Sequence, residues 1–358
     1  MRRWLPVLAA LTAAIVASPS RVDAQSLSRA SLDSVAAVDL FRGDGTTGNP
    51  GTSVDISSTV RLRPGWSLHL RPWFFRSSAD NASWSRELYQ AAVRYERSGL
   101  VSMRVDAGFI PSPIGLGMLD MRADVNPTIM GHPSYFTPLP LFDTAAPAVR
   151  AISATYPLGA SATISRTHWD ARVAAVTTSP ARRYAFNGVR NARTSPVAIV
   201  GGGLTIVPGF RVGASFADGR YASADELPSA DSSDRNLRMW TAEVEYARGY
   251  TKLAGEWTRE RFMRDDAATT ASTWFVQGLQ TMTPRWFAAA RLEQIDAPAA
   301  ARAATASRQT YRVGELTAGY RLTPELTLRT SLALVRRYGS SDNERRVGVQ
   351  AVWSRRWW

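Results

Sequence analysis

The 358-residue sequence contains no cysteine and almost no lysine. Without cysteine the chain can form no disulfide, no thiolate metal site and no cysteine nucleophile. Lys252 is the only lysine among 43 basic residues, so arginine carries the formal net charge of +13. Arginine binds carboxylates and phosphates through a planar fork, so an arginine-rich surface or lumen would attract anions. A bias in coding composition would produce the same excess, and the count alone does not separate the two.

Histidine is also scarce, and His69, His132 and His168 lie far apart without the spacing of a metal-ligand set. The stretch "SRTHWD" at 165–170 places a serine and an aspartate near His168, but alternation puts this histidine on a polar strand face. No glycine-rich phosphate loop occurs. We therefore predict that the chain is not an enzyme and uses no metal and no cofactor.

The first 24 residues have the pattern of a cleaved export signal. Arg2 and Arg3 precede an apolar run over residues 5–17, and small residues precede the expected cleavage point. The apolar run is too short to span a bilayer comfortably. We predict a signal peptide at 1–24 and a mature chain at 25–358. Because this chain is exported, we expect no nucleic-acid partner despite its charge.

Long apolar runs are missing after the signal. The most apolar uncharged stretch, residues 194–210, holds three consecutive glycines and two prolines, which suits a strand leading into a turn better than a helix. Apolar and polar residues alternate through most of the chain, as in strands with one apolar face. The clearest apolar faces contain Val54, Ile56, Val60, Leu62, Leu326, Leu328, Leu332 and Leu334.

Tight and long connections alternate between these segments. Seven tight turns are predicted at 64–65, 98–99, 158–159, 208–209, 249–250, 283–284 and 323–324, mostly marked by glycine or proline. Eight long connections are predicted at 42–51, 77–84, 111–147, 178–195, 218–235, 263–269, 295–306 and 337–343. These connections imply sixteen strands, and the count requires residues 160–177 to form one long strand, with a bulge near Arg166 where the apolar face switches.

An even strand count, tight turns on one side, long loops on the other and an export signal indicate an outer-membrane β-barrel. A closed barrel leaves no strand edge unpaired in lipid. The predicted fold class is therefore all-β: a transmembrane antiparallel barrel of about sixteen strands with short periplasmic turns and long external loops. Interfacial girdles would contain Trp66, Tyr95, Tyr156, Phe210, Trp240, Tyr246, Trp257, Trp286 and Trp353. A soluble exported sandwich or propeller is the alternative, but it would not usually show this asymmetry of connections.

The mature chain resembles a bacterial porin of the sixteen-stranded general or anion-selective type. The signal, the hairpin rhythm, the outsized loop after the fifth strand and the aromatic C-terminus carry the resemblance. It implies a homotrimer, a third loop folded into the lumen, and a last strand that acts as an assembly signal and closes the barrel against the first. Arg356 and Ser354 depart from the apolar pattern expected before Trp358, so either Trp357 takes the signal role or a bulge lies near Arg355.

The long connection at 111–147 is the predicted site of function, because a loop of this length is rare unless it is functional or disordered. Its apolar residues could pin it against the inner wall, so that Asp120, Arg122 and Asp124 project into the pore as a constriction. The alternative is an external loop packed at a subunit contact or over the barrel mouth. Residues available to pack include Ile114, Leu116, Ile129, Met130, Tyr135, Phe136 and Leu139.

Strands two to five carry polar-face arginines at comparable distances from their tight turns. Charged rings set ion preference in pores, and arginine favours anions. Facing this basic ladder with loop acids would create a transverse field. The alternative is that the arginines pair with Asp55, Glu96 and Asp106 to fill space. The predicted pore-lining residues are Arg61, His69, Arg71, Arg94, Arg104 and Asp106.

The predicted function is an outer-membrane porin that allows passive diffusion of small hydrophilic solutes with modest anion preference. The alternatives are a substrate-specific channel for phosphate or organic anions and a loop-plugged structural or adhesive barrel. The expected partners are small solutes or anions, outer-membrane lipid, and lipopolysaccharide. The phosphates of lipopolysaccharide would face loop arginines Arg182, Arg183, Arg190 and Arg193.

Overall fold

The computed structural model describes residues 29–358 except 44–49, 77–83, 117–121, 147, 153–156, 183–195, 229–232, 265–266 and 300–308. The predicted signal peptide at 1–24 lies outside the described residues, as does Asp120 of the predicted constriction.

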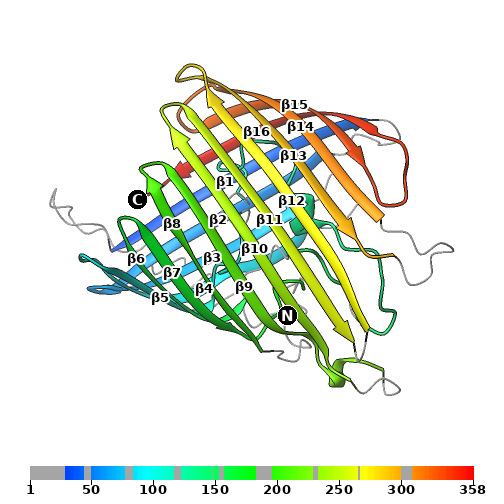
Figure 1. Cartoon of the computed structure of the whole chain (residues 1–358). Helices are drawn as coiled ribbons and strands as arrows, with labels where there is room; N and C mark the ends of the chain where they lie inside the picture. The colour runs from blue at the N-terminus through cyan, green and yellow to red at the C-terminus, as the bar shows by residue number, and fades with distance from the viewer. Residues whose placement is uncertain are drawn as a thin grey trace.

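Sixteen antiparallel strands close into one barrel, in which each strand pairs with its sequence neighbours and β1 pairs with β16 (Figure 1). The strands are β1 (Ala30–Gly43), β2 (Pro50–Arg63), β3 (Trp66–Arg76), β4 (Ser85–Arg97), β5 (Ser102–Phe109), β6 (Leu158–Arg166), β7 (Trp169–Val176), β8 (Val197–Val207), β9 (Phe210–Ala222), β10 (Arg235–Arg248), β11 (Thr251–Arg264), β12 (Ala267–Thr281), β13 (Trp286–Ala297), β14 (Gln309–Arg321), β15 (Leu326–Arg336) and β16 (Glu344–Arg356). The predicted fold class and strand number are confirmed.

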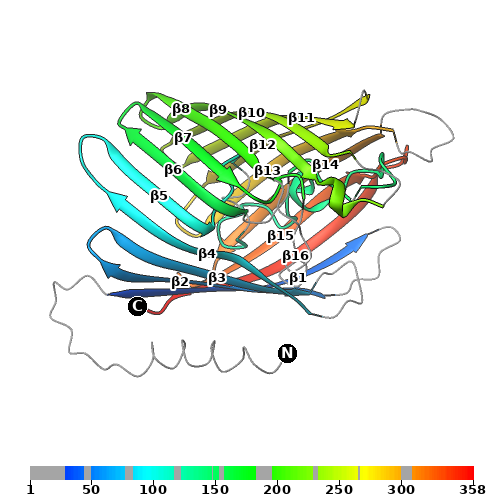
Figure 2. The same ribbon diagram turned by 90° about the horizontal axis from the view of Figure 1, so that it is seen from below.

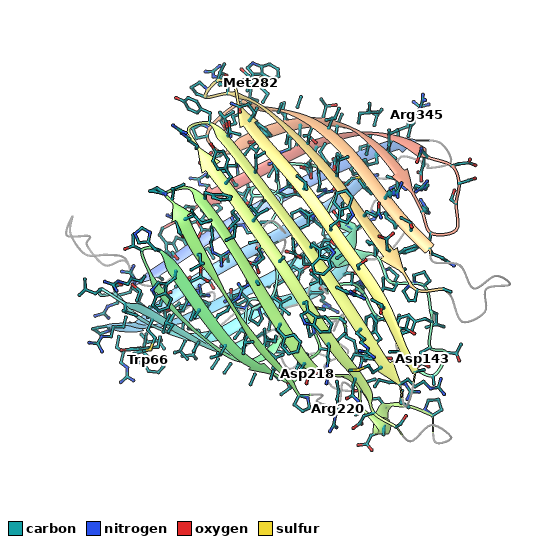
Figure 3. All side chains as sticks on the ribbon, viewed as in Figure 1. Trp66, Asp143, Asp218, Arg220, Met282 and Arg345 are labelled. Atoms are coloured by element: carbon teal, nitrogen blue, oxygen red, sulfur yellow. The ribbon has the colours of Figure 1, made fainter. Side chains whose placement is uncertain are left out.

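Alternation sorts side chains between the outside and the lumen, as predicted. On β15, Leu332 and Leu334 face outward and are about half exposed, whereas Ala333 and Val335 face inward and are fully buried. Outward apolar side chains leave the polar and charged ones to the interior, which is the division that a barrel in lipid requires. Aromatic pairs such as Trp66 with Tyr95 lie at the tight-turn end (Figure 3).

The prediction for strands six and seven is wrong in detail. Residues 158–159 begin β6 rather than forming a turn, and the expected single strand at 160–177 is two strands joined at Thr167 and His168. This turn contains neither glycine nor proline, so the usual sequence signal of a turn is missing. The change of apolar face near Arg166, interpreted as a bulge, lies next to the turn. The predicted connection at 263–269 is shorter, because β11 continues to Arg264 and β12 begins at Ala267.

The last strand closes the barrel without a bulge in its pairing with β1 or β15. Trp357 continues the outward alternation: its ring lies 6.0 Å from that of Trp353, and its indole nitrogen donates to Ser34 at 2.8 Å. Arg356 pairs with Asp33 at 2.9 Å. Trp357 therefore occupies the place of the final aromatic residue, and the predicted closure of the last strand against the first is confirmed.

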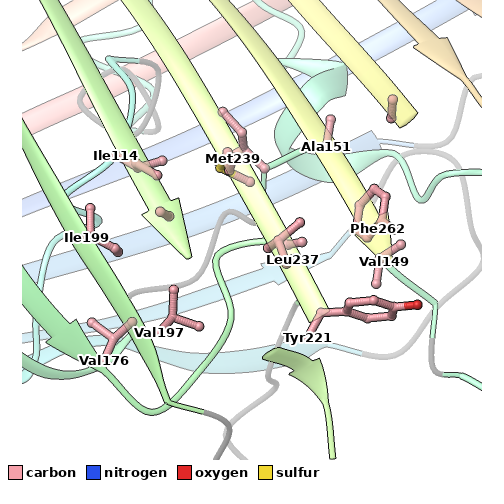
Figure 4. Packing of buried hydrophobic residues seen from close by; sticks show 14 of the residues in the cluster. Ile114, Val149, Ala151, Val176, Val197, Ile199, Tyr221, Leu237, Met239 and Phe262 are labelled. Carbon is pink, nitrogen blue, oxygen red and sulfur yellow. The ribbon is translucent and has the colours of Figure 1, made fainter. Parts of the chain in front are cut away.

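The connection between β5 and β6, residues 110–157, is called loop 3 here, and its described residues lie inside the barrel (Figure 2). It contains the short helix α2 (Pro133–Phe136), and the 3-10 turn η2 (Ala224–Glu226) follows β9. No helix among the described residues is long and apolar enough to cross a membrane. Loop 3 shares one hydrophobic core with the inner wall, where Ile114, Val149 and Ala151 pack against Val197, Ile199, Leu237, Met239 and Phe262 (Figure 4).

Candidate functional site: the lumen and loop 3

Three buried glutamates on the inner wall hold the backbone of loop 3. Glu293 on β13 accepts bonds from the backbone N–H of Ser134 at 2.7 Å and from its hydroxyl at 2.6 Å. Glu315 on β14 accepts the N–H groups of Ile129 and Met130 at 3.0 and 3.2 Å. Hydrogen bonds to charged groups stabilise by about 1.5–3 kcal/mol each.

The third glutamate, Glu256 on β11, holds the loop at two points. Its carboxylate accepts the backbone N–H of Leu116 and, at 3.2 Å, the phenol of Tyr135. Gly115 next to it has a φ of +76°, and a Cβ there would lie 2.8 Å from the carboxylate. Glycine is therefore required for the loop backbone to approach the wall this closely.

Two arginines bind the carbonyl groups of the same loop. Arg291 on β13 donates to the carbonyl of Met130 at 2.8 Å, and it also pairs with Glu315 at 3.2 Å. Arg329 on β15 donates to the carbonyl of Asn126 at 2.7 Å. The inner face of β11 and β13–β15 thus supplies acceptors for loop N–H groups and donors for loop carbonyls, and we call it the docking wall.

The outer end of loop 3 is fixed by an ion pair. Asp143 pairs with Arg235 of β10 at 2.6 Å, and Arg235 is fully buried. Burial strengthens the Coulomb attraction but removes both groups from water, so breaking one partner would leave a costly charge. This pair and the hydrophobic core hold the part of loop 3 nearest the long-loop end.

The predicted constriction residues take a different arrangement from the one expected. Arg122 and Asp124 form a two-bond ion pair with each other, at 3.0 and 2.8 Å. Ala123 between them packs on Val35 and Val352 of β1 and β16. The described part of the loop tip therefore carries balanced charge, and the transverse field stays a prediction that depends on Asp120.

The predicted pore-lining arginines lie on one inner face of β2–β5, which we call the basic wall. It lies across the lumen from the docking wall, because β3 and β11 are eight strands apart in a ring of sixteen. Arg71 binds Asp55 through two bonds, at 2.9 and 2.7 Å, and both are buried. Arg61 is exposed near the tight-turn end.

Two arginines of the basic wall share one carboxylate. Asp106 accepts a bond from Nε of Arg94 at 2.7 Å and from Nε of Arg104 at 2.6 Å. The Arg104 side chain is 39% exposed and that of Asp106 is 4% exposed, while Glu96, which lies 3.6 Å from Arg94, is 54% exposed. His69 lies beside this group and bonds to the hydroxyls of Thr59 and Ser67 at 3.0 and 2.9 Å. The space-filling alternative therefore holds for Asp55 with Arg71, and Arg94 and Arg104 are likewise matched by Asp106 and Glu96. Among the described residues this leaves Arg61 as the exposed arginine of the wall without a carboxylate partner.

A second charged network lies on β7–β10 and was not predicted as a site. Arg211 bonds to Asp170 at 2.9 Å and to Glu243 at 3.1 Å, and Arg172 also binds Glu243. A Cβ at Gly203 would lie 2.5 Å from an Arg211 nitrogen, so the bare glycine surface lets the guanidinium lie flat on the wall.

A cavity of about 490 Å³ opens between loop 3 and the tight-turn half of β9–β12. Leu116, Val125 and Pro127 contribute the loop side, while Arg211, Lys252 and Glu245 are among the wall residues. The described residues hold no group of three or more histidine, aspartate or glutamate side chains placed to bind a metal ion.

The docking residues are the functional residues that the sequence did not single out. Their signal was weak: Arg291 and Glu293 interrupt an inward row of small or apolar residues made by Ala289, Ile295 and Ala297. A charged pair in such a row needs a polar partner from elsewhere in the chain. That partner lies more than 150 positions away in loop 3, as in the 2.7 Å bond from Ser134 to Glu293.

Comparison with known proteins finds similar structures but no similar sequences. No family model and no curated sequence match the chain. A loop L8 deletion mutant of OmpT, an outer membrane protein of Vibrio cholerae, is 10% identical, with coverage of 91% of this chain and 99% of that chain and a TM-score of 0.60.

Two other solved structures are similar to the same degree. OmpF of Salmonella typhi, in complex with daunomycin, is 10% identical over 91% of this chain and 97% of that chain, with a TM-score of 0.61. The anion-selective porin from Comamonas acidovorans is 12% identical over 91% and 99%, with a TM-score of 0.57. The chain therefore has the porin fold, the closed sixteen-stranded barrel typical of the bacterial outer membrane.

Proposed function

We propose that the chain is an outer-membrane porin through which small hydrophilic solutes diffuse passively, with a modest preference for anions. The observation that carries this proposal is the unequal exposure of charges on the basic wall. Arg61 is exposed and the Arg104 side chain is 39% exposed, whereas the side chains of Asp55 and Asp106 are 6% and 4% exposed. Glu96 is the exposed carboxylate of this set, so the arginines open to solutes outnumber the carboxylates.

The proposed assembly is a homotrimer in the outer membrane, in contact with lipid and lipopolysaccharide. A solved structure of Vibrio cholerae OmpT is described as a trimer form, and 99% of that chain is covered in the structural match. The outward apolar side chains, such as Leu332 and Val349, supply the surface that lipid or a second protomer would cover.

Single-channel current in a planar bilayer with a potassium chloride gradient tests the function. An open, anion-preferring trimer gives conductance steps in threes and a reversal potential on the chloride side. A reversal potential of zero would contradict the proposed anion preference but not the proposed porin function. The absence of any current from correctly inserted protein would contradict the porin function itself.

A plugged barrel is the second candidate, because the hydrophobic core of loop 3 resembles a permanent filling more than a movable flap. Under this alternative the inserted protein is silent, and removing residues 133–146 would create a current that the intact chain does not carry.

A substrate-specific anion channel is the third candidate. Trp73 stacks on Phe75 and on Tyr89, with ring centroids 4.0 and 4.8 Å apart, and Arg71 lies over the Tyr89 ring. Tyr89 is buried in the core shared with loop 3, so Trp73 and Phe75 are the half-buried rings that an anion with a flat apolar ring would contact. Benzoate would then block chloride current at millimolar concentration while acetate would not, and equal effects of the two would argue against specificity.

A further inference from the structure

Four arginines form an array on the outside of the barrel at the long-loop end. They occupy four adjacent strands, β14, β15, β16 and β1, at outward positions of the alternation. Arg345 lies at this rim in Figure 3. The array, called the rim array below, consists of Arg312, Arg336, Arg345 and Arg42.

The strand register brings these arginines together. Arg312 is directly opposite Arg336 in the pairing of β14 with β15. Arg345 is opposite Leu334, two residues from Arg336, and Arg42 is opposite Val347, two residues from Arg345. Directly opposite side chains have Cβ atoms roughly 5 Å apart and diagonal neighbours about 7–8 Å apart. The array is therefore continuous across four strands.

Nothing in the described part of the chain neutralises the rim array. None of its arginines forms an ion pair within the described residues, and the outward described positions of β14, β15, β16 and β1 carry no acidic side chain. Asp296 on β13 is diagonal to Arg312, but it bonds to Gln294 and Thr310 instead. Glu344 faces inward and binds Arg346 and Arg337. Like charges directly opposite each other are destabilising, so the array favours an anion from outside the chain.

The place of the array identifies the anion. Directly below it the same strands carry the apolar outer belt, which includes Leu316, Leu332, Leu334, Val347 and Val349. A charge at the edge of such a belt lies at the level of lipid headgroups. Arginine rather than lysine suits phosphate, because its planar fork makes two parallel bonds.

Of the loop arginines expected to meet lipid phosphate, Arg182 lies within the described residues, and it binds groups of the chain itself. Arg182 is 13% exposed, pairs with Glu226 and donates to the carbonyl of Tyr221. Arg183, Arg190 and Arg193 lie outside the described residues.

We propose that the rim array is a binding site for the phosphate groups of outer-leaflet lipopolysaccharide, and that it spans more than one phosphate of a single lipid. Three strand spacings of about 4.8 Å make the array roughly 14 Å wide, too wide for one phosphate. The site lies on the outer surface and does not depend on conduction through the lumen, although it requires the outer-membrane location proposed above.

Native mass spectrometry of the purified protein in detergent tests the site, with a diphosphorylated lipid A as the probe and the same lipid without its phosphates as the reference. We expect the wild type to retain the phosphorylated lipid at least tenfold more tightly. In Arg312→Ser/Arg336→Ser this preference should be lost. Arg248→Ser/Arg355→Ser, which removes two charges at the tight-turn end, is the matched control and should bind as the wild type does.

Three outcomes would overturn the proposal. These are equal binding of the two lipids by the wild type, unchanged binding by the rim variant, and an equal loss in the control. If the second outcome came with a change in oligomeric state, the array would be assigned to a protomer contact instead. Arg312→Lys/Arg336→Lys, which keeps the charge, should bind at an intermediate level and guards against a folding defect. Single-channel current should be unchanged in every variant, so a failure here is distinguishable from a failure of the porin function.

Discussion

On the docking wall, buried charged side chains bond to the backbone of loop 3, whereas on the basic wall they bond mainly to one another. Glu293 and Glu315 are each about 2% exposed and bind loop N–H groups. Arg104 is 39% exposed and shares Asp106 with Arg94. The same residue types therefore have two roles in one barrel. Charged side chains that face the loop backbone hold the loop in place, and those that face the open lumen present charge to solutes.

This difference shows how burial separates structural from solute-facing charge. A buried carboxylate must have donors, and loop 3 supplies them. A half-exposed arginine keeps water and mobile ions as partners, so its charge acts on the lumen. Changes on the docking wall should alter the position of the loop, and changes on the basic wall should alter selectivity.

The largest effect is expected from Glu293→Ala, which removes the acceptor for Ser134 and His132 and leaves Arg291 with less compensation. Breaking one member of a buried charged group typically costs about 3–5 kcal/mol. We expect a lower urea midpoint of unfolding and a larger, noisier single-channel current. Glu96→Gln on the basic wall, where the side chain is 54% exposed, is the control and should leave the unfolding midpoint unchanged and the current no noisier than in the wild type.

Next in size is Arg94→Ser/Arg104→Ser, which removes two positive charges from the basic wall and leaves Asp106 and Glu96. We expect the reversal potential in a potassium chloride gradient to move toward the potassium side, because Asp106 is left without its two partners. The unfolding midpoint should change less than in Glu293→Ala. An unchanged reversal potential would mean that the basic wall does not set the ion preference.

A smaller effect is expected from Gly203→Val, which places a side chain where Arg211 lies. Overpacking typically costs about 1–3 kcal/mol. Here the arginine would be displaced from Asp170, and we expect altered conductance with a modest loss of stability. The substitution should have almost no further effect in an Arg211→Ser background, and additive losses in the two changes would show that the glycine has another role.

The smallest effect is expected from Tyr135→Phe, which removes one 3.2 Å bond to Glu256 and keeps the ring in the core. A net hydrogen bond of this kind contributes about 1 kcal/mol. The unfolding midpoint should fall slightly while the current stays as in the wild type. A current as disturbed as that of Glu293→Ala would show that the loop depends on every contact rather than on the glutamates of the wall.

Much of this fold follows from local patterns in the sequence. Alternation at Val54, Ile56 and Leu332 identifies the lipid face. The rhythm of connections yields sixteen strands, although a false turn at 158–159 offsets the missed turn at 167–168. The turn at Thr167 and His168 was not predicted, because neither residue has a strong turn preference. The apolar content of the third long loop also predicted that it packs inside the barrel.

The pairing of charges could not be predicted in the same way. Arg94 meets Asp106 because the register of β4 and β5 places them opposite each other. Register depends on turn geometry and bulges, such as the one between Arg71 and Pro72. A proline inside a strand indicates such a bulge but does not say which residues pair across it. The bond between Glu315 and Ile129 joins residues 186 positions apart, and no local pattern connects them.

Loop 3 is held largely through its own backbone, and this has a practical consequence for engineering. Glu256, Glu293 and Glu315 recognise N–H groups that every residue except proline possesses. These polar contacts therefore do not depend on which side chains the loop carries at those positions, whereas buried loop side chains such as Ile114 and Val149 are needed for the shared core. A designer could replace the solute-facing positions of the loop with reporter or binding groups and still expect the loop to return to the same place, which would make this barrel a scaffold for pores with interchangeable constrictions.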